Sequence, residues 1–253
     1  MFHDTGFYHS LARTQVESEL RAKEQEFTTR GLMYFVVKEL VRTFSSGRIP
    51  RAIELGGGYG TSLAILKRHI EIAEAISIDL VSPPQPVGGV TYLKGPIENL
   101  VTNIERDSVD LVLMLEVIEH LVDPDAVIEQ VHRILKPGGV LLITTPNLSS
   151  LSNRLMLLAG YLPFGLEVST KRAFGRPTNE GKVVGHLRLF TFKSLIEFMS
   201  YYGFVVREVY TIPEIRPANG HLSVVALNVI ERLSRIRKNW AFRIIAVTGK
   251  HQC

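Results

Sequence analysis

Short apolar runs alternate with helical patterns through most of this chain, and that alternation constrains the fold more than any other feature. Strands that alternate with helices form a mostly parallel sheet covered by helices on both faces. We therefore expect an α/β fold. The expected strands cover residues 51–55, 75–81, 90–94, 109–117, 139–146, 204–212 and 242–250, and the expected helices cover residues 61–70, 123–136 and 191–203.

Three segments depart from this rhythm. Residues 14–46 predict one or two helices, and residues 1–47 are expected to form an N-terminal helical cap. One face of this helical segment is expected to contain Leu32, Phe35, Val36, Leu40 and Val41. Residues 148–185 and 213–238 are expected to be insertions that form a lid or substrate region, since insertions on a regular scaffold commonly carry specificity. We expect residues 1–253 to form one domain.

The composition is that of an ordinary globular protein, with 45% apolar and 21% charged residues. The first residues lack the basic start and apolar core of a signal peptide, and no apolar run approaches the roughly 18 residues of a transmembrane helix. The single cysteine, Cys253, excludes an intrachain disulfide. These features favour a cytoplasmic protein.

The net charge of +4 hides an asymmetry, because residues 1–150 carry a net charge of −5 and residues 151–253 carry +9. A basic half suits an anionic partner such as phosphate, nucleic acid or a membrane surface, although a solvated basic face is the simpler interpretation.

The second insertion combines an apolar helical face with basic residues at its end. The apolar face contains Leu222, Val225, Val229, Ile230 and Leu233, and the basic residues are Arg232, Arg235, Arg237 and Lys238. One interpretation is peripheral attachment to an anionic membrane. The other is packing on the sheet or on a second subunit, in a monomer or a homodimer.

Glycines crowd the corner after the first expected strand, in the stretch "IELGGGYG" from Ile53 to Gly60. Such a corner allows a ligand to approach the backbone. Dinucleotide sites have the spacing G-x-G-x-x-G, whereas Gly56, Gly58 and Gly60 are spaced G-x-G-x-G. Glu54 would repel a pyrophosphate and would suit a ligand with a cationic amine. The corner therefore disfavours a nicotinamide-dependent oxidoreductase.

These residues resemble the E/D-x-G-x-G-x-G signature of the class I S-adenosylmethionine-dependent methyltransferases. Later motifs resemble the branch that includes the ubiquinone-biosynthesis O-methyltransferases: "SIDLV", "VDLVLMLEVIEHLVDP", "VHRILKPGGVLLITTPN" and "HLRLFTFKSLIEFMSYYGF". The resemblance covers residues 50–147 and 186–210. It implies a single methyltransferase domain with a Rossmann-like, doubly wound sheet of seven strands, mostly parallel, with an antiparallel last strand.

The resemblance also implies S-adenosylmethionine as the cofactor. The glycines would admit its methionine part, Glu54 would complement its ammonium, and Asp79 would accept both ribose hydroxyls. Many relatives carry Gly-Asp after the third strand, but here Pro96 stands in the Asp position, so the adenine amine must find backbone, water or Glu98. The expected cofactor contacts are Glu54, Gly56, Gly57, Gly58, Gly60, Asp79, Leu80, Pro96, Ile97, Glu98, Leu115 and Glu116.

Two histidines are candidate catalytic residues. His120 follows the fourth expected strand, and His186 lies where the chain re-enters the scaffold. Each is either a general base for a hydroxyl acceptor or a structural residue of its loop. Glu116, Glu119 and His120 alone are a poor ligand set, so no metal is expected.

The function that these motifs predict is S-adenosylmethionine-dependent methyl transfer, with O-methylation of a small or lipid-like hydroxyl compound as the expected reaction. A nucleic-acid acceptor is not expected. The alternative is a methyltransferase-like protein without catalysis that acts as a binding or scaffold partner. The fold does not choose among acceptors.

Overall fold

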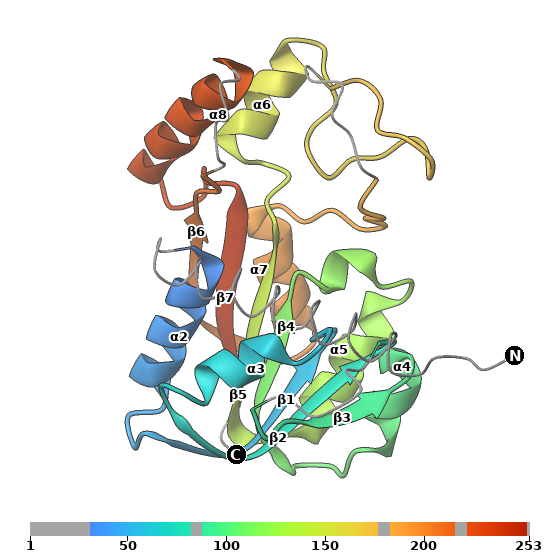
Figure 1. The fold of residues 1–253 in the computed structure, drawn as a ribbon, viewed down its shortest axis with the longest axis vertical. Helices are drawn as coiled ribbons and strands as arrows, with labels where there is room; N and C mark the ends of the chain where they lie inside the picture. Colours follow the sequence, from blue (N-terminus) through green and yellow to red (C-terminus); the bar gives the residue numbers. More distant parts are fainter. Residues whose placement is uncertain (1–30, 82–87, 177–182, 216–221, 252–253) are drawn as a thin grey trace, which may run out of the picture. The chain divides into compact units, whose positions relative to one another are not determined.

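Seven strands form one sheet in the part of the chain that the computed structural model describes, which is residues 31–81, 88–176, 183–215 and 222–251 (Figure 1). The strand order is β3-β2-β1-β4-β5-β7-β6. The strands are β1 (Arg48–Leu55), β2 (Glu71–Asp79), β3 (Thr91–Lys94), β4 (Val109–Leu115), β5 (Leu135–Pro146), β6 (Phe204–Ile212) and β7 (Arg243–Lys250). The sheet is mostly parallel and ends in antiparallel strands, which confirms the predicted fold.

Seven helices and three short 3₁₀ turns accompany these strands among the described residues. The helices are α2 (Leu32–Thr43), α3 (Thr61–Leu66), α4 (Ile97–Leu100), α5 (Pro124–Ile134), α6 (Leu151–Leu158), α7 (Phe192–Tyr201) and α8 (Leu222–Leu233). The turns are η1 (Val101–Asn103), η2 (Ile118–His120) and η3 (Ser234–Ile236). Three sequence predictions lie partly outside the described ranges: the helical segment over residues 14–46, whose residues 14–30 are not described, and the two insertions, whose residues 177–182 and 216–221 are not described.

The chain divides into two compact units. The first contains the described residues up to Leu115, residues 125–142 and the segment from Gly249, and the second contains residues 116–124 and 143–248. The expectation of one domain over residues 1–253 stays a prediction, as do the proposed roles of the two insertions.

The first unit positions a corner of backbone at the point where the strand order reverses. β1 pairs in parallel with both β2 and β4, and Ile49, Ala52, Ile53 and Leu55 on β1 are fully buried. Burial of four consecutive residues, 52–55, is typical of a parallel strand that is covered on both faces. Ligands of open α/β sheets bind at the carboxyl ends of strands near such a reversal.

Two element predictions in this unit need correction. On α2 the buried face contains Met33 and Val37, whereas Val41 is exposed and Phe35 is only partly buried. The helix is apolar on more than one side, so periodicity alone left its buried face ambiguous. The expected helix over 123–136 ends at Ile134, because Lys136 already belongs to β5. The ammonium of Lys136 lies 2.9 Å from a carboxylate oxygen of Asp110.

The second unit contains the helices of both interrupting segments. α6 and α8 lie against each other (Figure 1), and the hydroxyl of Ser152 on α6 donates to Glu231 on α8 at 2.8 Å. α7 begins with a capping box, in which Thr191 and Ser194 each bond the other's backbone N–H. Across the described ranges, no helix combines the length and the apolar character needed to cross a membrane.

Candidate functional site

The glycine corner, defined here as residues 54–60, leaves no room for a side chain at two of its glycines. A Cβ built on Gly57 would lie 2.5 Å from Ser77 Oγ and 2.7 Å from Glu54 Oε2. Gly60 has a φ of +68°, and a Cβ there would lie 2.9 Å from the ring of Tyr92. Glycine is therefore required for space at the first position, and for both space and conformation at the second.

The two carboxylates predicted for this corner both lie at it. Glu54 is 1% exposed and pairs in register with Ser77 on β2. Asp79 ends β2, and its Oδ2 accepts the Gly58 N–H at 2.8 Å while Oδ1 accepts the Val81 N–H at 3.1 Å. A carboxylate has about four acceptor positions, so Asp79 holds the corner in place and still has capacity for ligand hydroxyls.

The remaining predicted cofactor contacts of the first unit differ in burial. Leu80 is 66% exposed, whereas Ile97 is buried. The Gly95 N–H donates to the Asp79 carbonyl at 2.9 Å, which brings the turn containing Pro96 beside the end of β2. Pro96 is the N-cap of α4, and Glu98 lies in the first turn of that helix. Leu115 is the last residue of β4. The Gly56 N–H donates a hydrogen bond to the Ile78 carbonyl.

Two residues at the corner were missed from the sequence. Ser77 is 1% exposed, and its hydroxyl has no hydrogen-bond partner among the described residues. The hydroxyl of Tyr92 on β3 donates to the Tyr59 carbonyl and so fixes the corner. Only strand pairing brings either residue to the corner, and the sequence gives no local signal for that.

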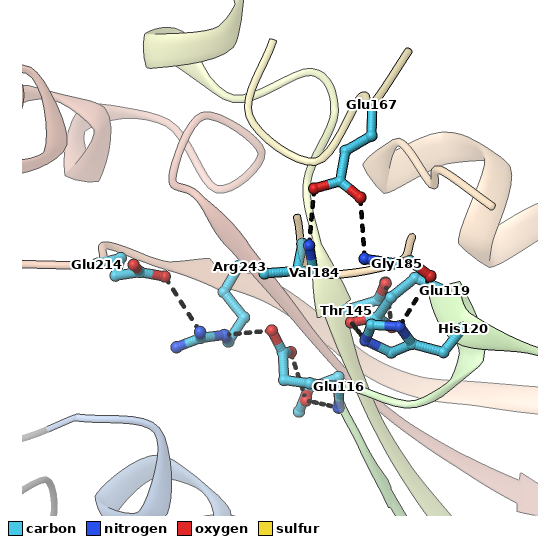
Figure 2. A network of polar contacts seen from close by, with 10 residues as sticks. Glu116, Glu119, His120, Thr145, Glu167, Val184, Gly185, Glu214 and Arg243 are labelled. Atoms are coloured by element: carbon cyan, nitrogen blue, oxygen red, sulfur yellow. Dashed lines mark hydrogen bonds and ion pairs between the residues drawn. The ribbon is translucent and has the colours of Figure 1, made fainter. Parts of the chain in front are cut away.

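Glu116 stands at the start of the second unit and is held by an ion pair. Its φ is +56°, which is uncommon for a residue with a side chain, and such strain concentrates at functional sites. Its N–H and one carboxylate oxygen bond Thr144, and Arg243 Nε lies 2.9 Å from the other oxygen (Figure 2). Arg243 also pairs with Glu214 at 3.1 Å. The sequence did not predict this bridge, since Arg243 lies 127 positions beyond Glu116.

Glu119 is a buried carboxyl whose proton affinity is perturbed. It is 1% exposed and accepts a bond from the Thr145 hydroxyl at 2.9 Å. Burial, and next the charge of Glu116, raise the pKa of Glu119 to about 8. Near pH 7 this group is therefore mostly a neutral acid.

The structure brings the two predicted histidines together. The rings of His120 and His186 have centroids 4.8 Å apart and meet edge to face. The Nδ1 of His120 lies 3.1 Å from the Gly185 carbonyl, so this nitrogen carries the proton and Nε2 keeps a lone pair. Burial, and next the charge of His120, lower the pKa of His186. Both rings face the buried Glu119 carboxyl, whose Oε1 lies 4.0 Å from His120 Nε2.

We call Glu119, His120 and His186 the histidine cluster. Their ligand atoms all lie within 4.8 Å of one another, so the cluster could hold a metal ion. The set that the sequence suggested, Glu116 with Glu119 and His120, is a poor one for a metal. The structure instead adds His186, while Arg243 holds Glu116.

The chain belongs to a family of methyltransferases, because residues 24–209 match the family described as "Methyltransferase domain". It is a class I, Rossmann-like member of the S-adenosylmethionine-dependent methyltransferases. A crystal structure of a SAM-dependent methyltransferase from Archaeoglobus fulgidus has the same fold, with a TM-score of 0.52, 19% identity, and coverage of 90% of this chain and 99% of that one.

Two curated relatives are similar over shorter segments. A mitochondrial ubiquinone biosynthesis O-methyltransferase of Dictyostelium discoideum is 45% identical over 64 residues, which is 25% of this chain and 20% of that protein. A ubiquinone biosynthesis O-methyltransferase of Proteus mirabilis is 29% identical over 91 residues, which is 36% of this chain and 34% of that protein. The similarity therefore spans a fifth to a third of each relative's length.

Proposed function

We propose that this protein transfers the methyl group of S-adenosylmethionine to a hydroxyl oxygen of a small or lipid-like acceptor. The observation that carries the proposal is the glycine corner, where a buried carboxylate and a strand-end aspartate flank glycines that neighbouring side chains leave no room to replace. Family membership supports methyl transfer. Local similarity to two ubiquinone biosynthesis O-methyltransferases supports oxygen as the acceptor atom.

The glycine corner suits each polar part of this cofactor. Glu54 offers a buried carboxylate to the ammonium, and the backbone of the glycines, which carries no side chains, allows the methionine part to approach closely. Asp79 accepts the ribose hydroxyls with the acceptor positions that Gly58 and Val81 leave. When bound, the cofactor supplies a sulfonium methyl that is already activated, so the protein mainly aligns the acceptor and excludes water.

We propose that the adenine is flanked by apolar residues close to the corner. Leu80 follows the end of β2, Ile97 begins α4, and Leu115 ends β4, which pairs with β1. Since Pro96 has neither a side-chain acceptor nor a backbone N–H, the adenine amine is left to the backbone carbonyls of this turn or to Glu98.

The histidine cluster supplies the base in this proposal. His120 Nε2 has the lone pair because Nδ1–H is bonded to Gly185, so Nε2 takes the proton of the acceptor hydroxyl as its oxygen attacks. His186 is the neighbouring neutral ring, and its lowered pKa favours that form. The same three groups could instead hold a divalent cation that lowers the pKa of the hydroxyl.

A lipid-like acceptor is supported by the surface of the two insertion helices. Leu155, Leu157 and Leu158 on α6 are exposed, the last by 84%. Val225, Val229 and Leu233 on α8 are also exposed, and Ile236 follows them. An apolar helix face beside basic residues suits the interface of an anionic membrane.

Calorimetry with S-adenosylmethionine and its demethylated product tests the cofactor assignment. We expect micromolar binding, and Asp79→Ala should weaken it by about 1–3 kcal/mol because charge-assisted bonds are lost. Glu105→Gln, an exposed change in the same unit, is the matched control. Folded protein that gives no heat with either ligand contradicts the proposal.

Labelled cofactor and a panel of hydroxyl, amine and carboxyl acceptors then test the reaction. We expect methyl transfer to a hydroxyl compound. Cofactor binding without product on any acceptor of the panel would favour the methyltransferase-like binding protein instead.

A further inference from the structure

The carboxylate of Glu167, in the first insertion, accepts hydrogen bonds from the backbone segment that contacts His120. Glu167 accepts the N–H groups of Val184 and Gly185 at 2.8 and 2.9 Å, one on each oxygen (Figure 2). The carbonyl of the same Gly185 bonds His120 Nδ1. The Glu167 side chain is only 6% exposed, and Arg176 lies 3.8 Å from it. One peptide segment therefore links Glu167 to the ring that the proposed reaction uses.

The same turn of the insertion also reaches the second histidine. Gly165 has a φ of +91°, and a Cβ built on it would lie 3.1 Å from His186 Nδ1. The Gly165 backbone is among the groups that raise the pKa of His186 against the lowering effect of burial. Gly165 thus lies beside His186, and Glu167 acts on His120 through the Val184–Gly185 segment.

Buried amides anchor this turn to the end of β5. Asn153 on α6 is fully buried, and its Oδ1 accepts the Phe164 N–H at 2.8 Å. Its Nδ2 donates to the Asn147 carbonyl at 3.1 Å, and the Asn147 side chain bonds the backbone at Ala241. Such a network of satisfied buried polar groups fixes one geometry. These hydrogen bonds therefore connect the turn to the end of β5.

We infer that the turn Pro163–Glu167, which we call the positioning turn, sets the tautomer of His120 and the placement of both rings, with Glu167 as the positioning residue. Two hydrogen bonds to Glu167 hold the Val184–Gly185 backbone so that the Gly185 carbonyl lies at His120 Nδ1. Because a carbonyl can only accept a hydrogen bond, Nδ1 must carry the proton. Nε2 is then the nitrogen left with a lone pair, as the base or ligand role requires. Glu167 touches neither cofactor nor acceptor in this scheme and acts through His120. The effect on turnover rests on the proposed function, but the effect on the tautomer does not.

NMR of protein with isotope-labelled nitrogen in its histidine rings tests the inference. In the wild type we expect His120 to be the Nδ1–H tautomer near neutral pH. Glu167→Ala should convert its signals toward a mixture with the Nε2–H tautomer, because the Gly185 carbonyl is no longer held. The exposed Glu197→Gln on α7 should leave the signals unchanged. Signals of His120 that stay the same in Glu167→Ala overturn the inference.

Kinetics with cofactor calorimetry form the second arm. Glu167→Ala should lower kcat on the order of 10²-fold through misplacement of the ring, and leave the Kd for S-adenosylmethionine unchanged. If kcat is unaffected while the tautomer changes, the cluster is not the catalytic base, and that part of the proposed function fails while the positioning stands.

A conservative variant keeps the test usable if the alanine variant does not fold. Glu167→Gln retains one acceptor and turns an amide N–H toward the second donor, so one of the two bonds is lost. We expect an intermediate tautomer mixture and a smaller loss of kcat. A Gln variant with wild-type NMR signals and wild-type kcat contradicts the inference.

Discussion

Single residues decide where protons reside in the second unit. The protonated acid Glu119 and the two histidines occupy one cluster, and the charged pair of Glu116 and Arg243 lies in the same unit. Without the Gly185 carbonyl, neither nitrogen of His120 would be fixed as the donor. The chemistry of the cluster therefore depends on backbone contacts as much as on residue type.

Replacing either histidine should separate turnover from cofactor binding. If His120 is the base, His120→Ala should lower kcat by about 10²–10⁴-fold, and the Kd for S-adenosylmethionine should change little. His186→Ala should lower kcat less, because that ring supports its neighbour. His69→Ala, in the first unit, is the control. Full activity in both cluster variants means that catalysis rests on alignment alone.

Removal of divalent metal distinguishes the two roles of the cluster. If His120 is the base, dialysis against a chelator should leave turnover unchanged. Activity that disappears on chelation and returns with added Zn²⁺ or Fe²⁺, which imidazole ligands suit, with no return in His186→Ala, assigns the cluster to a metal ion instead. Steady-state kinetics on the dialysed wild-type protein decides between them.

At the level of elements, the glycine corner is limited by space as well as by backbone conformation. Gly57→Ala should lower stability by about 1–3 kcal/mol and weaken cofactor binding, because the new methyl meets Ser77 and Glu54. Gly47→Ala adds a methyl at a φ of +71° where nothing lies within 4 Å, so it measures backbone strain alone. Denaturant unfolding and calorimetry should show lost cofactor affinity only in the first variant.

Glu231 joins α8 to its neighbours and makes the stability of that contact depend on pH. It accepts bonds from Ser152 and from the N–H groups of Glu214 and Phe242, yet burial raises its pKa above the ordinary value near 4.5. The folded state then binds this proton more tightly than the unfolded state. The stability gained is present below the ordinary pKa and is lost as pH rises through the raised one.

Substitutions at Glu231 test this sign. In Glu231→Gln the amide can donate to Ser152 and accept both N–H groups, so the decline in unfolding free energy above pH 4.5 should become shallower. Glu231→Leu leaves buried donors unsatisfied and should cost about 1–3 kcal/mol. Denaturant unfolding over a pH series measures both. An unchanged pH slope in the Gln variant contradicts the assignment.

At the scale of the whole molecule, charge is distributed unevenly, with a net of +9 in residues 151–253. We expect salt-sensitive binding to anionic vesicles, since each basic group near such a surface contributes about 1 kcal/mol. The double variant Arg235→Glu, Arg237→Glu should lose most of that binding. Lys38→Glu, Arg106→Glu makes the same change of net charge elsewhere and should keep it.

Vesicle flotation at low and high salt measures this binding. Wild-type protein that stays in the soluble fraction at low salt excludes the membrane interpretation. The exposed face of α8 would then be a surface for packing or dimerisation, as the alternative interpretation of the sequence holds.

The sequence by itself determined the elements and the glycine corner. The predicted strand over 204–212 matches β6, and the strand over 242–250 matches β7 within one residue. Glycine spacing and strand-end carboxylates are local patterns, so they identify Glu54 and Asp79 without any tertiary information. The predicted face of α2 was right for Leu32, Val36 and Leu40, which are buried, and wrong for the exposed Val41, because an apolar pattern on several sides does not say where the core ends.

Tertiary structure alone decided how the second unit's polar groups are paired. Glu167, Arg243 and Gly185 have no motif. Gly185 contacts His120, 65 positions away, Glu167 acts on His120 through Gly185, 18 positions away, and Arg243 contacts Glu116, which is distant in the sequence. Long-range contacts depend on how the chain folds back, which neither periodicity nor spacing encodes. The sequence therefore supplied the two histidines as candidates, and only the fold put them 4.8 Å apart with a defined tautomer.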